Sequence, residues 1–188
     1  MFTLRTSFLG LILASSFLLT ACGPGSPGTM KALMAPPPDS ALDRYTELTV
    51  DLTEGAGVNL LPMDKQRLLE RIVTRVKVKA PSRFAEINSP APNGSVLHAI
   101  VQLTRYDEGN NFARFMLAGL GQIHIDANVS LQDGRNQAEL RKYLITKTFA
   151  WGGYYGLLTR ITDVEEGFTE GVVSAILGES DAKLEPNK

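Results

Sequence analysis

The feature of the sequence that most restricts the fold is a strict alternation of apolar and polar side chains over the eleven residues 122–132. Positions with odd numbers are apolar and those with even numbers are polar, beginning with Gln122 and Ile123. Successive side chains of a β-strand point to opposite faces, so this pattern gathers the apolar side chains on one face. We therefore expect an antiparallel strand with one face in the core and the other in water.

Further segments are predicted to form strands of the same sheet. Asp133-Gly134 is typical of a tight turn, and residues 138–149 are rich in Tyr, Ile, Thr and Phe, which predicts the second strand of a hairpin. Residues 45–52 and 97–103 show the same two-residue alternation, and a short strand is expected at residues 83–87.

Two amphipathic helices complete the predicted domain. Asp64 is the expected N-cap of the first helix, which ends before Pro81. Thr162-x-x-Glu165 has the spacing of a capping box for the second, and Gly178 ends it. Their apolar stripes are Leu68, Leu69, Ile72, Val73 and Val76 in the first helix, and Ile161, Val164, Phe168, Val172, Ala175 and Ile176 in the second. We predict an α+β fold, with a mixed, mainly antiparallel sheet and two main helices packed on one face.

The N-terminus predicts export and lipidation. Arg5 is followed by an uncharged apolar stretch, residues 7–19, which is shorter than the about 20 residues that a membrane-spanning helix needs. Leu19-Thr20-Ala21-Cys22 resembles the bacterial lipobox, in which the cysteine receives diacylglycerol and becomes the first residue after cleavage. Cys22 is the only cysteine, so no disulfide within the chain is possible. We expect a lipoprotein that is attached to a membrane through lipid on Cys22 and does not span it.

These signals divide the chain into four expected parts. Residues 1–21 are a lipoprotein signal peptide, and residues 22–43, rich in Pro, Gly, Ser and Ala, are the lipidated cysteine and a flexible tether. Residues 44–180 form a single α+β domain, and residues 181–188 are a polar tail. The expected location is the cell envelope. In a Gram-negative source, Gly23 in place of Asp favours the outer membrane, with the domain facing the periplasm.

The charge balance argues against nucleic acid as a partner. The chain carries 19 Lys and Arg and 20 Asp and Glu. Cleavage after residue 21 removes Arg5 alone, which leaves 18 basic and 20 acidic groups and a net charge of −2. A weakly acidic domain offers no basic surface for a phosphate backbone.

Short glycine-based motifs in the middle of the chain resemble a known family. A Tyr-Asp-x-Gly turn at Tyr106 and Asp107, Arg114, the pair Gly119-Leu120-Gly121 and the turn at Asp133-Gly134 carry the resemblance. With Gly152, Gly153 and Gly156, these motifs resemble a bacterial lipoprotein family catalogued as domain of unknown function 4410, over roughly residues 45–178. The resemblance implies no established activity. It implies a small α+β domain like those of envelope lipoproteins that act as accessory or assembly factors.

Candidate catalytic or metal-binding residues are few. His98 and His124 are the only histidines, both lie on the polar sides of predicted strands, and Asp126 is the nearest third ligand. An alternative function is therefore a small-ligand or metal-binding domain, or a hydrolase, that uses His98, His124 and Asp126. Ordinary solvated histidines are favoured over this site, and we expect no catalytic residue, bound metal or cofactor.

Aromatic residues interleaved with glycines give the strongest candidate for a binding surface. Residues 149–158 contain Trp151, Tyr154 and Tyr155 in an expected loop, and Trp and Tyr are enriched at binding hot spots. A loop that caps the core is the competing interpretation. Arg105 and Arg114 flank the second candidate segment, which ends at residue 121, although pairing with local acids or carbonyls is the favoured explanation for them. We expect a non-enzymatic module that binds an envelope protein through these residues.

Overall fold

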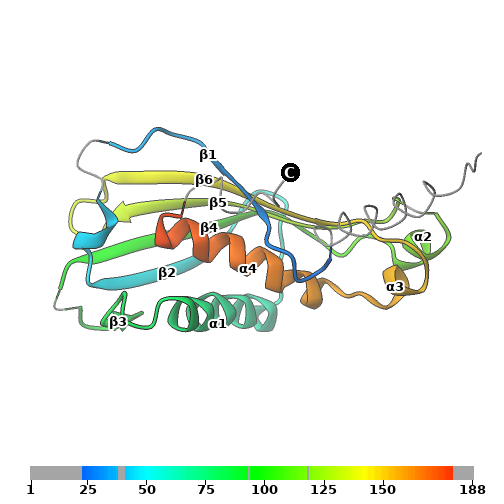
Figure 1. Ribbon diagram of the computed structural model, residues 1–188, viewed down its shortest axis with the longest axis horizontal. Coiled ribbons are helices and arrows are strands. Elements are labelled where there is room, and N and C mark those ends of the chain that lie inside the picture. The colour runs from blue at the N-terminus through cyan, green and yellow to red at the C-terminus, as the bar shows by residue number, and fades with distance from the viewer. Residues whose placement is uncertain (1–22, 38–40, 93, 118, 180–188) are drawn as a thin grey trace, which may run out of the picture.

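The structure is an elongated α+β domain with one sheet and with helices on one of its faces (Figure 1). This computed structural model describes residues 23–37, 41–92, 94–117 and 119–179. The lipobox, Cys22 and the expected tail at 181–188 lie outside the described residues.

Six strands form a mixed sheet in the order β1-β6-β5-β4-β2-β3. Their bounds are β1 (Thr29–Ala32), β2 (Glu47–Glu54), β3 (Glu86–Ile87), β4 (Val96–Asp107), β5 (Ile123–Asp133) and β6 (Glu139–Phe149). The pairs β1–β6, β6–β5 and β5–β4 are antiparallel, whereas β2 is parallel to both β4 and β3. The predicted hairpin is confirmed as β5 and β6, and β4 continues beyond residue 103 through Tyr106 to Asp107.

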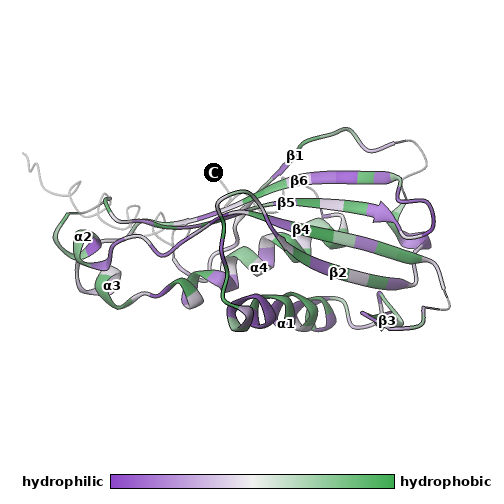
Figure 2. Cartoon of the chain, turned by 180° about the vertical axis from the view of Figure 1, so that it is seen from behind, coloured by the Kyte–Doolittle hydropathy of each residue, from purple (hydrophilic) through white to green (hydrophobic). Residues whose placement is uncertain are grey.

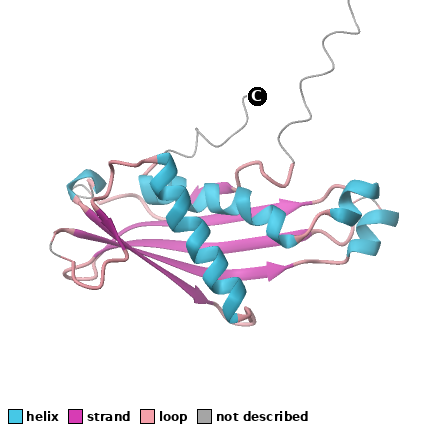
Figure 3. Cartoon of the chain, turned by 90° about the horizontal axis from the view of Figure 1, so that it is seen from below, coloured by secondary structure: helices cyan, strands magenta, loops and turns pink. Residues whose placement is uncertain are grey.

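Two long helices, α1 (Pro62–Lys79) and α4 (Ile161–Leu177), cover one face of the sheet (Figure 3). Three short helices are added: η1 (Leu42–Arg44), α2 (Asn111–Met116) and α3 (Gly153–Leu158). Figure 3 shows α2 and α3 together at one end, away from the two long helices. The predicted fold class is thus confirmed. No helix within the described ranges is long and apolar enough to cross a membrane.

The core forms where the apolar sides of the alternating strands meet the two helix stripes. The odd-numbered residues from 123 to 131 on β5 are fully buried, as are those from 97 to 103 on β4. Leu68, Ile72 and Val76 of α1 and Phe168 and Val172 of α4 are equally inaccessible. The two-residue and 3.6-residue periods of the sequence therefore identify the buried faces correctly.

The domain begins earlier than residue 44, which corrects the expected extent of the tether at 22–43. Residues 29–32 form the edge strand β1, and the side chain of Met30 is buried in the core. Gly28 N donates to the carbonyl of Gly167 at 2.7 Å, so the segment is hydrogen-bonded to α4 as well as to β6. Composition suggested a flexible chain because Pro, Gly and Ser are frequent there, but backbone pairing with β6 and the burial of Met30 hold the strand.

Both predicted helix caps are displaced. Helix α1 begins at Pro62 after Leu61, so Asp64 lies within its first turn and is not the N-cap. Helix α4 begins after Arg160, whose backbone N donates to the Asp163 carboxylate at 2.8 Å. Glu165, expected to close a capping box with Thr162, is instead completely buried between α1, α4 and β4.

Candidate functional site

The fold brings two chain connections together at one end of the sheet. The β4–β5 connection contains α2 and the β6–α4 connection contains α3, and the register pairs Asp107 with His124 and Ile123 with Phe149 at this end. Both connections therefore leave the sheet side by side, and the two short helices pack against each other. Figure 1 shows them beyond the ends of the long strands.

Arg114 joins the two connections from inside. Its guanidinium donates to the carbonyl oxygens of Glu108 and Gly121 at 2.7 Å each, and to those of Gly156 at 2.9 Å and Thr159 at 3.1 Å. Two of these carbonyls belong to each connection, and the arginine is only 1% exposed. Burial lowers the pKa of the Arg114 guanidinium below its ordinary value.

Turn chemistry explains the path of the β4–β5 connection. The Asp107 carboxylate accepts from Gly109 N at 2.8 Å, and this hydrogen bond, with the nearby Arg105, holds the pKa of Asp107 below its usual range. The Asn110 side chain caps α2 by accepting from Ala113 N at 2.9 Å. Gly121 has a positive φ of 66°, and a Cβ there would overlap the Asn110 carbonyl, so a larger residue is excluded.

Large apolar side chains are exposed all over this end of the molecule. Nine of the thirteen exposed large apolar residues in the described part of the chain lie on α2, α3 and the loops beside them, and Figure 2 shows green hydrophobic stretches at this end. We call them the apolar tip: Phe112, Phe115, Met116, Leu117, Leu120, Trp151, Tyr154, Tyr155 and Leu158. Contiguous apolar patches on a soluble surface usually mark an interaction site.

The aromatic residues of the tip are held in defined positions. The ring of Tyr155 lies edge-on to both Phe149 and Trp151, with ring centroids 5.9 Å apart in each pair. Phe149 is fully buried, so this chain of rings connects the core to the surface. Tyr154 is 71% exposed and Trp151 is 37% exposed.

The five residues predicted as partner contacts differ in their exposure. Trp151, Tyr154 and Tyr155 are exposed together, as a contact surface requires. Arg105 is exposed on β4 and bonds Asp107 at 3.2 Å. Arg114 must be corrected, because its burial on four carbonyls makes it a structural residue that no partner can reach. Sequence reasoning missed the apolar residues of α2. Phe112, Phe115 and Met116 form a hydrophobic cluster between two predicted strands, and such a cluster outside the sheet is a sign of an exposed apolar surface.

The alternative site at His98, His124 and Asp126 is not assembled. His98 pairs with Gln132 and His124 with Asp107, so the histidines are eight residues of β5 apart, roughly 27 Å at strand spacing. His98 Nε2 lies 2.6 Å from Asp51, and His124 Nδ1 lies 3.1 Å from Thr148. Burial, together with Arg105, lowers the pKa of His124. Within the described ranges, no group of three metal-ligating side chains converges.

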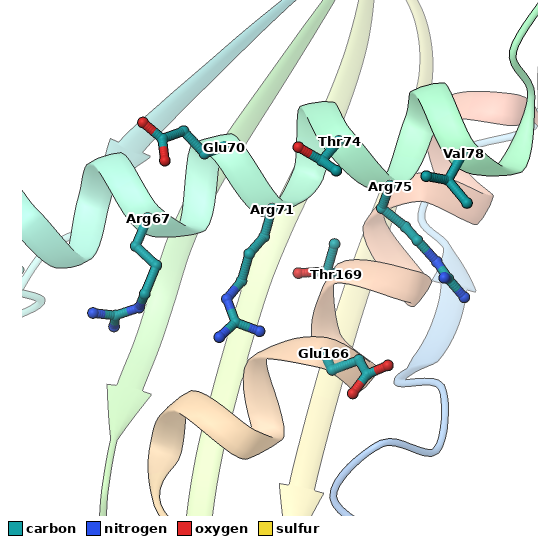
Figure 4. A pocket seen from close by; sticks show the side chains of 8 residues that line it. All are labelled: Arg67, Glu70, Arg71, Thr74, Arg75, Val78, Glu166 and Thr169. Atoms are coloured by element: carbon teal, nitrogen blue, oxygen red, sulfur yellow. The ribbon is translucent and has the colours of Figure 1, made fainter.

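A groove of about 420 Å³ between α1 and α4 is the other concave feature of interest (Figure 4). Arg67, Arg71 and Arg75 extend from α1 along it. Arg67 and Arg71 both pair with the buried Glu165, at 2.8 Å and 3.2 Å, and Arg75 pairs with Glu170 at 2.6 Å. Arg67 also pairs with Asp64 at 2.6 Å, so each of the three arginines has an acidic partner and the groove is an ion-pair seam between the helices.

Fold and tip together define an α+β domain that exposes an apolar end. The chain belongs to the family described as a domain of unknown function (DUF4410), whose model matches residues 60–153. The match includes β4, α2, β5 and β6, the elements that lead into the tip, and it ends at the first residue of α3. None of the curated proteins compared with the chain matches it.

Solved structures are similar to this chain at low sequence identity. A PelC dodecamer from Paraburkholderia phytofirmans is 18% identical, with a TM-score of 0.50 over 79% of this chain and 96% of that chain. Protein XCC0632 from Xanthomonas campestris is 11% identical, with a TM-score of 0.47 over 81% of this chain and 91% of that one. At such identities the similarity to PelC shows a common fold alone, and the match to XCC0632, with its lower score, adds no argument.

Proposed function

We propose that the protein is a non-enzymatic accessory lipoprotein of the cell envelope that works by docking through its apolar tip. The observation that carries this proposal is the gathering of nine exposed apolar side chains at one end of the sheet. A rigid sheet that ends in ordered aromatic side chains suits recognition, since little side-chain entropy is lost on contact.

Lipid on Cys22 is the proposed membrane attachment. The lipobox and the signal sequence support it, as does the resemblance to an envelope lipoprotein family. The location follows from this attachment: the cell envelope, and the outer membrane facing the periplasm in a Gram-negative source. An envelope protein served by this accessory module is the expected partner.

A photo-crosslinking amino acid at position 154, introduced into the protein in its native envelope, tests docking through the tip. Tyr154 is 71% exposed, and Val78 on α1 is 66% exposed, which makes position 78 a matched control. We expect crosslinked adducts from position 154, with protein or with lipid, and few from position 78. Equal yields at the two positions, or none at either, would overturn the proposal.

A further inference from the structure

The first residues after Cys22 are clamped to the domain. The Lys147 ammonium on β6 donates to the carbonyls of Gly23 at 2.9 Å and Ser26 at 2.7 Å, and to the Ser26 hydroxyl at 2.7 Å. Lys147 is only 3% exposed. A buried ammonium must be surrounded by oxygen atoms, so these bonds are costly to break.

Helix α4 holds the same segment from the other side. Gly167 leaves room for the chain, because a Cβ there would overlap the Ser26 carbonyl and approach that of Pro24. Gly28 N then donates to the Gly167 carbonyl, and β1 begins one residue later. The segment from residue 23 to β1 is thus a latch, fixed to β6 and α4, and not a free spacer.

The latch lies at the end of the sheet that carries the tip. Lys147 precedes Phe149 by two residues, roughly 7 Å along a strand, and Phe149 contacts Tyr155 of the tip. Figure 1 shows the blue start of the described chain on the side of α4 that is nearer to α2 and α3. A lipid on the residue before Gly23 therefore starts from the half of the molecule that carries the tip.

The chemistry of the tip suits a lipid surface. Residues 109–125 and 148–162 contain no Asp or Glu, and Arg114 and Arg160 are their only Lys or Arg residues. Arg114 is buried, so these two stretches would bring no carboxylate and one exposed cation, Arg160, to the membrane. The exposed carboxylate of Glu108 lies just outside them, beside Leu158 and Arg160. Trp and Tyr prefer the membrane–water interface, and Phe, Leu and Met favour the adjoining acyl region.

We infer that the apolar tip inserts into the bilayer beside the lipid on Cys22, so that the domain is attached at two points and held in one orientation. This inference rests on the proposed lipid anchor and names the bilayer as the occupant of the tip. A protein occupant would also bury apolar side chains. However, the clamped latch brings the tip to the membrane in every lipidated molecule, whether or not another protein is present.

Trp151 is the only tryptophan of the chain, so its fluorescence reports on the tip directly. The test uses the mature lipidated protein reconstituted in vesicles of phosphatidylcholine and phosphatidylglycerol, with and without brominated acyl chains. We expect emission at shorter wavelength than that of the detergent-free Cys22→Ser variant in buffer, and loss of most of the intensity with brominated lipid. The matched control is Trp151→Phe combined with Val78→Trp, whose single tryptophan lies on α1 and should not be quenched by lipid.

The outcomes separate this inference from the proposed function. If aqueous iodide, and not brominated lipid, quenches Trp151, or if both tryptophan positions are quenched equally, insertion of the tip is refuted. In that case, protein adducts from a crosslinker at position 154 would leave docking intact and make a protein the occupant. If Trp151 is unquenched by lipid and position 154 also gives no adducts, both proposals fail.

Discussion

Single residues acquire their roles here from contacts that span the chain. Arg114 binds four carbonyls from two connections, and Glu165 binds two arginines of α1 and the Tyr106 hydroxyl. Burial, with the hydrogen bond to Glu165, raises the pKa of Tyr106, so this hydroxyl stays protonated. Both charged groups are structural because removal of either would leave buried partners without hydrogen bonds.

Substitution Arg114→Met is expected to destabilise the domain by about 3 kcal/mol, because four carbonyls lose a charged donor. Urea unfolding followed by circular dichroism measures the change. Arg105→Met is the control, since the exposed pair with Asp107 contributes less than about 1 kcal/mol. Equal effects of the two substitutions would contradict the assigned role of Arg114.

At the scale of elements, α1 and α4 are joined by ion pairs as well as by apolar packing. Glu170 of α4 accepts from Arg75 at 2.6 Å and from Lys79 at 2.7 Å. Burial by itself would raise the pKa of Glu170, but these two hydrogen bonds outweigh it and the pKa lies below the ordinary value of 4.5. The charged carboxylate is therefore the form that holds the two helices together.

The interaction of Glu170 with Arg75 and Lys79 predicts part of the loss of protein stability in acid. A carboxyl group whose pKa is lower in the folded state stabilises the protein above its unfolded pKa, and the contribution is lost as the pH falls below about 4.5 and through the folded value. We expect Glu170→Gln to flatten the fall in unfolding free energy over that window, measured by denaturant titrations at several pH values.

The latch is a second element-scale feature with a specific test. Gly167→Ala places a methyl group against the Ser26 carbonyl, so residues 23–28 should detach while the sheet remains intact. Hydrogen–deuterium exchange should show faster exchange in this segment and unchanged protection in β4 and β5. Unchanged protection of the segment would mean that Lys147 alone is sufficient to hold it.

The whole molecule has a core that is complete without the tip. The most exposed tip side chains, Phe112, Tyr154 and Leu158, contribute little to stability because they remain largely in water. Exposed substitutions usually change the free energy of unfolding by less than about 0.5 kcal/mol. The retention of these side chains on one end of an elongated domain is better explained by contact with another component than by folding.

The triple variant Phe112→Ser, Tyr154→Ser and Leu158→Ser tests whether the tip serves contact with another component or folding. We expect an unfolding free energy within about 1 kcal/mol of wild type and several-fold weaker binding of a hydrophobic dye to the folded protein. A triple substitution to Ser at the equally exposed Leu61, Met63 and Val78, which lie at the two ends of α1, should retain most of the dye signal. A loss of stability typical of core substitutions would show that the tip is part of the core.

Much of the fold is determined by the sequence alone, because backbone periodicity is local. The two-residue alternation on β5 and the 3.6-residue stripes of α1 and α4 each depend on neighbouring residues, and they predicted the elements, their buried faces and the fold class. The aromatic residues at 151, 154 and 155 were predicted as a candidate surface, but the sequence left open whether they are exposed or cap the core, and the structure exposes them.

Only the tertiary structure decided how distant segments meet. It buried Arg114, turned Glu165 from an expected cap into a helix–helix contact, and clamped residues 23–28 on Lys147. It also separated His98 from His124 and joined α2 to α3 in one tip. Each outcome depends on contacts between residues tens of positions apart, which composition and spacing do not encode, because hydrogen bonding and burial depend on what the folded chain places nearby.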